Sequence, residues 1–343
     1  MEKHSTSSPF IRACDYQAIR EDNMIAGRTF IKAASVAAAA AATPAISMRQ
    51  GHAQQVPNSV GTAPPKLKAP ANACDCHHHI YDPARFPMPP SPRPAPSNGT
   101  VADYRLLQKR IGTTRSVVVQ PRNYAIDNEV TLDALKQFGA NARGVAVVHP
   151  TVTDSELKRF NAAGVRGIRF SLGDPATSVV KVNMIEPLAK RIANLGWHIQ
   201  FNVDGEQVVE LADILRRLPT PLVFDHLGNP PLPAGIDHPS HTIIRSLIDK
   251  GRTWVKLSGA YANSKIGPPE YPEATKIAQA FVKAAPERLV WGSDWPHPGL
   301  PNNNKPDDAL LFDLLNAWAP DEATRNRILV SNPEALYGFA KSA

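Results

Sequence analysis

Three short clusters of ionisable side chains carry most of the chemistry that this sequence offers. They are the segment from Asp75 to His79, the pair Asp225 and His226, and the segment from Asp294 to His297. Imidazole nitrogens and carboxylate oxygens are common zinc ligands, and the same groups act as general acids and bases. The clusters therefore predict a metal centre or a proton-transfer site, provided that the fold brings them together.

The first cluster has the spacing of two side chains that share one face of a strand. His77 and His79 are two residues apart, so they project to the same side, and His78 projects toward the covering helices. Together with His226 they form three nitrogens for a metal ion or three donors for a carbonyl oxygen. The alternative is a set of core histidines paired with carboxylates such as Asp75.

Asp294 is the predicted general base. Trp291 and Trp295 flank it, and we expect desolvation by these rings to raise its pKa. The alternative is a carboxylate that hydrogen-bonds its own backbone in the turn before Pro296.

Arg169, Gln120 and His297 are the predicted substrate-binding residues. Each stands at or just beyond the end of an expected strand. The planar guanidinium of Arg169 fits a carboxylate or sulfonate with two donors. The alternative for Arg169 is a buried ion pair with Asp204 or Asp75.

No covalent nucleophile is evident. The sequence has no G-x-S-x-G motif, and Cys74 and Cys76 precede the histidines and are expected out of phase with His77 and His79. A covalent triad is therefore not expected.

The elements that must position these residues alternate between short β-rich runs and longer helical patterns. The expected strands are 73–80, 116–120, 144–149, 165–170, 197–203, 221–226, 253–258 and 288–294. Eight such units predict a (β/α)8 TIM barrel, whose active sites lie at the C-terminal ends of the strands. A doubly wound sheet is the alternative, but the sequence has no glycine-rich phosphate motif.

The chain divides into a leader, residues 1–70, and a catalytic domain, residues 71–343. The leader has a basic start, an alanine-rich run after Arg28-Thr29-Phe30-Ile31-Lys32, and a proline-rich linker. This pattern is similar to a twin-arginine export signal, although Gly27 replaces its first arginine, and Met24 is an alternative start. It predicts a periplasmic protein, or a cytoplasmic one if the leader is not functional.

Charge and composition restrict the kinds of molecule that this protein is expected to bind. The net charge is +7, from 38 basic and 31 acidic residues, with no basic block that would indicate nucleic-acid binding. The apolar run of the leader is too short for a membrane anchor. A small anionic ligand fits this balance, and the oligomeric state stays open.

The three clusters together resemble the amidohydrolase superfamily, and more narrowly its lactonase branch. The motifs are Asp75-x-His77-x-His79, Phe224-Asp-His226-Leu-Gly and Trp291-Gly-Ser-Asp294-Trp-Pro-His297. The resemblance implies hydrolysis of a small anionic lactone, with Asp294 as the base. It implies that His77, His79 and His226 polarise the carbonyl, directly or through a metal, while Arg169 binds an acidic group and His297 lines the pocket.

Departures from the family pattern restrict the substrate. Pro175 stands where pyrone-dicarboxylate enzymes carry an arginine, Asn202 replaces a tyrosine, and Ser258–Ala262 lacks another arginine. Fewer arginines argue against a pyrone with two carboxylates and favour a muconolactone-type substrate. Among the named compounds, 4-sulfomuconolactone is the first choice. A metal-dependent decarboxylase and a sugar-acid lactonase remain alternatives, as does a non-catalytic barrel that binds an anion.

The resemblance also bears on metal content. Strand four offers no lysine and strand five offers Gln200 and Asn202, so a two-metal site is not expected. One zinc ion on His77, His79, His226 and Asp294 is the favoured reading, and a metal-free site with the same histidines as donors is the alternative.

Overall fold

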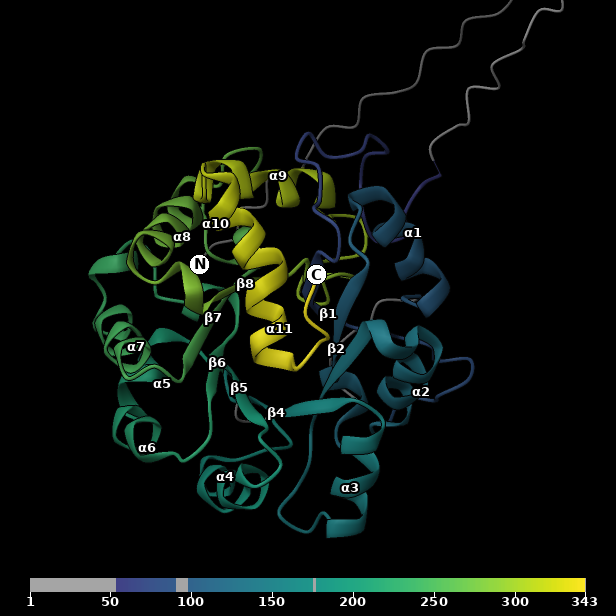
Figure 1. Ribbon diagram of the computed structural model, residues 1–343, viewed down its shortest axis with the longest axis vertical. Helices are drawn as coiled ribbons and strands as arrows, with labels where there is room; N and C mark the ends of the chain where they lie inside the picture. The colour runs from purple at the N-terminus through teal and green to yellow at the C-terminus, as the bar shows by residue number, and fades with distance from the viewer. Residues whose placement is uncertain (1–53, 91–97, 175–176, 343) are drawn as a thin grey trace, which may run out of the picture. The chain divides into compact units, whose positions relative to one another are not determined.

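A single parallel sheet, closed into a barrel, organises the chain. The computed structural model describes residues 54–90, 98–174 and 177–342. Its eight strands are hydrogen-bonded in chain order (Figure 1). They are β1 (Cys74–His78), β2 (Arg115–Val119), β3 (Ala142–Ala146), β4 (Val165–Ser171), β5 (His198–Asn202), β6 (Leu222–Phe224), β7 (Thr253–Leu257) and β8 (Leu289–Trp291).

The sheet closes where the segment after β8 returns to β1. The Asp294 amide donates to the His77 carbonyl at 2.7 Å, and the His79 amide donates to the Trp295 carbonyl at 2.8 Å. A Cβ at Gly292 would lie 2.5 Å from that of His77, so only glycine permits this approach. The closed barrel confirms the predicted (β/α)8 fold and excludes the doubly wound sheet.

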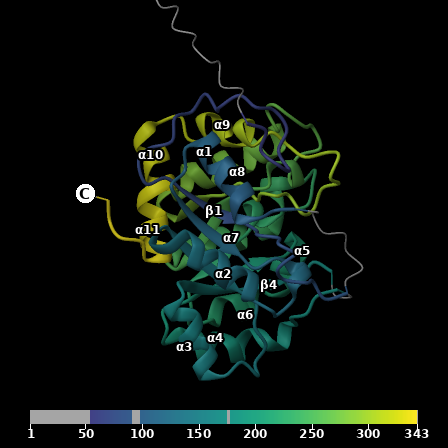
Figure 2. The ribbon, with the colours of Figure 1, turned by 90° about the vertical axis from the view of Figure 1, so that its right-hand side faces the viewer.

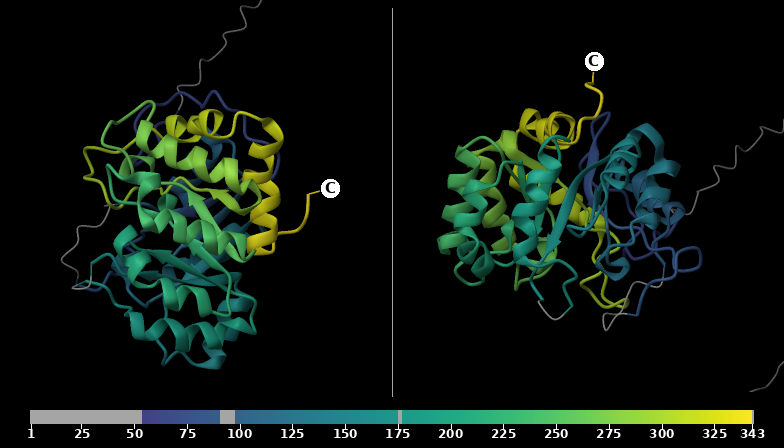
Figure 3. Two further views of the ribbon diagram at one scale, coloured as in Figure 1. Left: turned by 90° about the vertical axis from the view of Figure 1, so that its left-hand side faces the viewer. Right: turned by 90° about the horizontal axis from the view of Figure 1, so that it is seen from below.

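Helices surround the strands and supply the outer layer of the core (Figures 2 and 3). In α4 the apolar residues Ile185, Leu188 and Ile192 recur at helical spacing and are buried, as expected for a helix packed on a sheet. The helices are α1 (Val101–Ile111), α2 (Glu129–Phe138), α3 (Asp154–Ala162), α4 (Ile185–Ala193), α5 (Gly205–Glu210), α6 (Ala212–Arg217), α7 (Pro239–Asp249), α8 (Pro272–Ala284), α9 (Asp308–Trp318), α10 (Glu322–Asn326) and α11 (Asn332–Tyr337).

An apolar cluster fills the barrel at the N-terminal ends of the strands. It includes Val117, Val223 and Val290 from the strands and Tyr337 from α11, which crosses this end in Figure 1. Cys74 and Cys76 belong to the same cluster, so both face the interior. The expectation that they are out of phase with His77 and His79 is wrong, because the β1–β2 register shifts between Asp75 and His78.

Residues 54–70, the end of the predicted leader, lie against the barrel. Val56 is 1% exposed, and the Pro57 carbonyl accepts a hydrogen bond from Trp295 Nε1 at 2.8 Å. The predicted signal segment itself lies outside the described residues. Among the residues that are described, no helix is long and apolar enough to cross a membrane.

Candidate active site

A cavity of about 400 Å³ opens at the C-terminal ends of the strands. This is the end at which TIM barrels hold their active sites. Its walls are formed by His79, Tyr81, Arg122, Asn123, Arg169, Asn202, His226, Asn229, Tyr261, Ala262, Asp294, Pro298 and Gly299.

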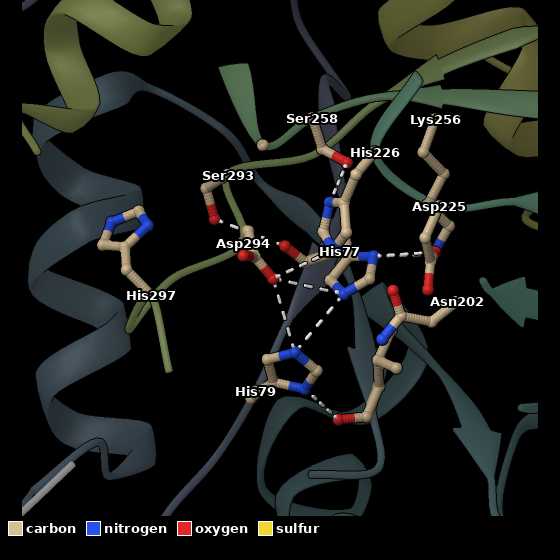
Figure 4. A network of polar contacts seen from close by, with 12 residues as sticks. His77, His79, Asn202, Asp225, His226, Lys256, Ser258, Ser293, Asp294 and His297 are labelled. Carbon is tan, nitrogen blue, oxygen red and sulfur yellow. Dashed lines mark hydrogen bonds and ion pairs between the residues drawn. The ribbon is translucent and has the colours of Figure 1, made fainter. Parts of the chain in front are cut away.

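Three imidazoles and one carboxylate converge beside this cavity (Figure 4). His77 Nε2 and His79 Nε2 are 3.3 Å apart. Asp294 Oδ1 lies 3.4 Å from each of these nitrogens and 3.8 Å from His226 Nε2. The three sequence clusters, far apart along the chain, therefore meet at one point.

The outer ring nitrogens of the three histidines have polar partners of their own. His79 Nδ1 lies 2.7 Å from the Val119 carbonyl oxygen, and His77 Nδ1 lies 3.1 Å from Asp225 Oδ1. His226 Nδ1 lies 2.9 Å from Ser258 Oγ. The Val119 carbonyl at Nδ1 fixes the proton there, so in neutral His79 the lone pair on Nε2 faces Asp294. His77 Nδ1 lies between Asp225 Oδ1 and Lys256 Nζ, which is 3.3 Å away.

This donor set fits a metal ion. Burial lowers the pKa of His77 and of His79, which favours neutral rings with available lone pairs. Asp294 Oδ1 is buried and has no hydrogen-bond partner. The ligand atoms of His77, His79 and Asp294 all lie within 4.8 Å of one another. A cation between these groups would satisfy the ring nitrogens and the carboxylate together, and nitrogen with carboxylate ligands is a zinc-type set.

Asp294 does not have the raised pKa expected from its tryptophan neighbours. Burial raises the pKa of this carboxyl, but His226, His79 and His77 together lower it well below its usual range. The expectation from the sequence is therefore wrong, because tertiary contacts place three imidazoles beside this carboxylate. The Tyr261 hydroxyl donates to Asp294 Oδ2, the second oxygen.

The backbone around the site adopts conformations that side-chain-bearing residues rarely use. His226, Asp294 and His297 have φ values of 48°, 64° and 57°. Such residues are disfavoured by about 1–3 kcal/mol each and cluster at functional sites. A Cβ at Gly259 would lie 2.8 Å from His226 Nδ1, so glycine allows this ring to reach Ser258.

A buried ionic network forms the floor beneath the histidines. Asp225 accepts from Arg169 Nε at 3.0 Å, and its other oxygen lies 3.7 Å from Lys256 Nζ. Lys256 is fully buried on β7 and also donates to Gln200 at 2.8 Å. Arg169 thus lines the cavity but is paired with Asp225, which corrects the alternatives Asp204 and Asp75. No local pattern connects Lys256 with the site, because its polar contacts come from β1, from β5 and from the segment after β6.

Asp75 belongs to a separate contact outside the cavity wall. It accepts hydrogen bonds from the Ser293 amide at 2.9 Å, the Ser293 hydroxyl at 2.6 Å and the Tyr104 hydroxyl at 2.9 Å. These bonds join β1 to the segment after β8. His78 stacks on Tyr104 with ring centroids 3.6 Å apart, which confirms that His78 faces the helices.

Gln120 and His297 lie behind the cavity wall rather than on it. Gln120 Nε2 donates to the Asp127 carbonyl at 2.6 Å, so it anchors the loop after β2. His297 Nε2 lies 3.2 Å from Asp308 Oδ2, and its Nδ1 lies 3.3 Å from the Tyr261 hydroxyl. The structure thus places both side chains as supports for residues that do line the cavity.

Tyr261 and Arg122 are site residues that the sequence reasoning did not assign. Both stand in short 3₁₀ turns directly after strands, η6 (Ala260–Ala262) after β7 and η1 (Arg122–Tyr124) after β2. Their position just beyond a strand end was the available signal, because these loops form the mouth of a TIM barrel.

The closed barrel, with a histidine–carboxylate cluster at its C-terminal face that could hold a metal ion, defines the class of TIM-barrel enzymes. Within that class, the Amidohydrolase family profile matches residues 74–339. The chain therefore belongs to the amidohydrolase family and is a hydrolase. The resemblance seen in the sequence motifs, including that to its lactonase branch, is confirmed.

Individual relatives cover most of this chain. A 2-pyrone-4,6-dicarboxylate hydrolase of Comamonas testosteroni is 34% identical over 282 residues, 80% of this chain and 92% of the relative. A 4-sulfomuconolactone hydrolase of Rhizobium radiobacter is 34% identical over 280 residues, 81% of this chain and 93% of the relative. A crystal structure of an Agrobacterium tumefaciens protein without ligand is 32% identical, with a TM-score of 0.73, and matches 81% of this chain and 100% of that chain.

Proposed function

We propose that the protein hydrolyses an anionic lactone of the muconolactone type, with 4-sulfomuconolactone as the first substrate to test, in the breakdown of aromatic compounds. The observation that carries this is the convergence of Asp294 Oδ1 on the Nε2 atoms of His77, His79 and His226. Relatives named as lactone hydrolases support the reaction class. The cationic side chains Arg122 and Arg169 on the cavity wall support an acidic substrate.

Each step of the proposed lactone hydrolysis is carried out by a side chain at the cavity. Asp294 takes a proton from a water molecule, and the water oxygen forms a bond to the lactone carbonyl carbon. A hydrogen bond from the Tyr261 hydroxyl holds the Asp294 carboxylate in place. The contact between His226 Nδ1 and Ser258 Oγ holds the facing ring. The bond between the carbonyl carbon and the ring oxygen then breaks, and the proton held at Asp294 passes to that oxygen.

We propose one zinc ion on His77, His79, His226 and Asp294. Bound there, it would polarise the carbonyl and lower the pKa of water. Asp225 orients His77 from behind, the usual arrangement for a ligating histidine. Elemental analysis of the purified protein tests this: about one zinc per chain is expected, with loss in a His77→Ala, His79→Ala double variant. A full turnover rate in protein free of metal would contradict it.

The Asp294→Asn variant tests the reaction. We expect turnover of a lactone panel to fall at least ~10³-fold, because the amide cannot accept the proton. The Asp133→Asn variant, which changes a carboxylate near the surface, is the matched control and should keep full activity. Undiminished turnover in Asp294→Asn would contradict the assignment of the base, and release of carbon dioxide from a hydroxybenzoate-type acid would favour a decarboxylase.

We also propose that the leader exports the protein to the periplasm. The support is the twin-arginine-like segment around Arg28 and the alanine-rich run that follows it. Cell fractionation of the full chain tests this, with an Arg28→Gln variant for comparison. Wild-type protein that stays in the cytoplasm at full length would contradict export.

A further inference from the structure

The segment that precedes β1 is packed into the molecule. We call residues 54–63 the N-terminal strap. The strap contains no helix or strand, yet Val56 is 1% exposed and Ser59 is 4% exposed. Gln55 Nε2 donates to the Ser59 carbonyl at 2.6 Å and closes a turn within the strap. Connecting segments usually lie on the surface, so a buried serine here indicates a specific docking contact.

The strap binds near both ends of the segment that joins β8 to α9. Trp295 Nε1 donates to the Pro57 carbonyl at 2.8 Å, and the Asp308 amide donates to Ser59 Oγ at 3.2 Å. Trp295 directly follows Asp294, and Asp308 is the first residue of α9. The strap therefore holds the segment that carries the proposed base at two separate points.

Arg110, on α1, binds the strap and the start of α9 together. Its Nη1 donates to Ser59 Oγ at 3.1 Å and to the Val60 carbonyl at 3.0 Å, and its side chain is 5% exposed. Its Nε donates to the Ala63 carbonyl at 2.9 Å, and its Nη2 lies 2.6 Å from Asp307 Oδ1. One buried, charge-paired guanidinium thus contacts three strap residues and the residue before α9.

A chain of polar contacts leads from Asp308 to the proposed base. Asp308 Oδ2 lies 3.2 Å from His297 Nε2, and His297 Nδ1 lies 3.3 Å from the Tyr261 hydroxyl. The Tyr261 hydroxyl in turn donates to Asp294 Oδ2. Asp308 and His297 are fully buried, so these contacts are made in an interior of low dielectric, where they are strong. The position of the Asp294 carboxylate therefore depends on where Asp308 is held.

We propose that the N-terminal strap is part of the active site as a positioning element, and that Ser59 is the residue through which it acts. Ser59 Oγ accepts from both the Asp308 amide and Arg110, so it joins the strap, α1 and α9 at one atom. A shift of about 1 Å at a reacting group can cost about 100-fold in rate, which makes this contact outside the cavity matter for turnover. The inference rests on the proposed function, in which Asp294 takes the proton.

Turnover of a lactone panel tests the strap. In Ser59→Ala the Asp308 amide loses its acceptor, and we expect kcat to fall about tenfold while KM stays within about twofold, because the cavity wall is unchanged. Asp308→Asn weakens the next contact, to His297, and should lower kcat in the same way. Asp313→Asn is the matched control. This carboxylate binds the amides of residues 66–67 at 3.0 and 2.7 Å, beyond the strap, and the variant should keep the kcat of wild type.

Amide hydrogen exchange provides a second readout that needs no substrate. Ser59→Ala should exchange faster than wild type over residues 293–308, whereas exchange in α4 should be unchanged. Asp313→Asn should exchange as wild type does over residues 293–308. A change confined to KM, exchange over 293–308 at the wild-type rate in Ser59→Ala, or equal effects in Asp313→Asn would overturn the role of the strap. If wild type opens no lactone but exchange responds as expected, the proposed hydrolysis is overturned and the positioning role stands.

Discussion

Two buried carboxylates of the barrel, Asp225 after β6 and Asp75 on β1, have partners of opposite kinds, charged for the first and uncharged for the second. Asp225, after β6, faces Arg169, Lys256 and the ring of His77. Asp75, on β1, faces the uncharged donors Ser293 and Tyr104. Both side chains are essentially removed from solvent, with exposures of 1% and 0%.

The two environments shift the pKa values in opposite directions. Burial raises the pKa of Asp225, but His77, Arg169 and Lys256 outweigh it and hold that pKa well below its usual range. Burial raises the pKa of Asp75 to about 6, and its hydrogen bonds from Ser293, His77 and Tyr104 only limit the rise. Burial alone therefore does not set the charge of a carboxylate here, since the charge of its partners does.

The two carboxylates therefore have different roles. Asp225 balances the positive charge of the cavity floor and orients His77, so it acts on the site. Asp75 joins β1 to the segment that carries Asp294, so it acts on the barrel closure. Four variants test this comparison, in order of expected effect.

Asp225→Asn should have the largest effect. It leaves Arg169 and Lys256 without a buried counterion and removes the acceptor at His77 Nδ1. We expect unfolding free energy to fall by about 3–5 kcal/mol and turnover to fall by about 10–100-fold. Denaturant unfolding and lactone turnover measure the two. Asp213→Asn, at an exposed ion pair with Arg216, is the control and should change neither stability nor turnover. Equal effects in the two variants would contradict the role of Asp225.

Asp75→Asn should change the pH dependence of the unfolding free energy. The folded pKa of Asp75 is about 6 against an ordinary 3.8, so between these values the folded state binds a proton that the unfolded state has released. Stability from this group is therefore greatest below pH 4 and falls by about 3 kcal/mol as pH rises to 7, at about 1.4 kcal/mol per pKa unit.

The asparagine variant cannot titrate and should lack that part of the pH dependence. Unfolding free energies of wild type and Asp75→Asn, measured from pH 4 to pH 7, test this directly. Parallel curves would show that Asp75 does not have the raised pKa. Asp225 should show the opposite sign, because its stabilisation is complete above its unfolded pKa and is lost as pH falls through the lower folded value.

Lys256→Met should destabilise less than Asp225→Asn, by about 1–2 kcal/mol. It removes hydrogen bonds to Gln200 and to the Cys76 carbonyl, but Asp225 keeps Arg169 and His77 as partners. Burial already lowers the pKa of Lys256 to about 8, so its charged form is poorly solvated. In the double variant with Asp225→Asn, removal of the unpaired ammonium should recover part of the lost stability. An additive loss would argue against direct coupling of the two groups.

Ser293→Ala should have the smallest effect, about 1 kcal/mol. Asp75 loses the hydroxyl donor at 2.6 Å but keeps the Ser293 amide and Tyr104. Loss of a donor to the charged form should move the pH-dependent window of stability upward relative to wild type. Ser246→Ala, at an exposed serine, is the control for stability. If the pH range over which stability changes is the same as in wild type, the hydrogen bond from Ser293 Oγ to Asp75 does not affect the pKa of Asp75.

The fold class and most of the histidine–carboxylate centre could be predicted from local patterns in the sequence. Alternation of strand and helix patterns specified eight units, and each chemical residue stood at a strand end. In a TIM barrel the C-terminal ends of the strands meet at one face. The proximity of His77, His79, His226 and Asp294 could therefore be predicted from their positions at strand ends. The family motifs added the reaction class.

The electrostatics of the site and the contacts that support it could not be predicted in this way, because they depend on tertiary neighbours. Arg169 lies on β4, Lys256 on β7 and Asp225 just after β6, and no local pattern shows that they share one buried network. The lowered pKa of Asp294, the interior position of Cys74 and Cys76, and the supporting places of Gln120 and His297 depend on through-space neighbours and on one register shift in β1. Periodicity reports which face a side chain occupies, whereas charge and contact depend on what the closed barrel places opposite it.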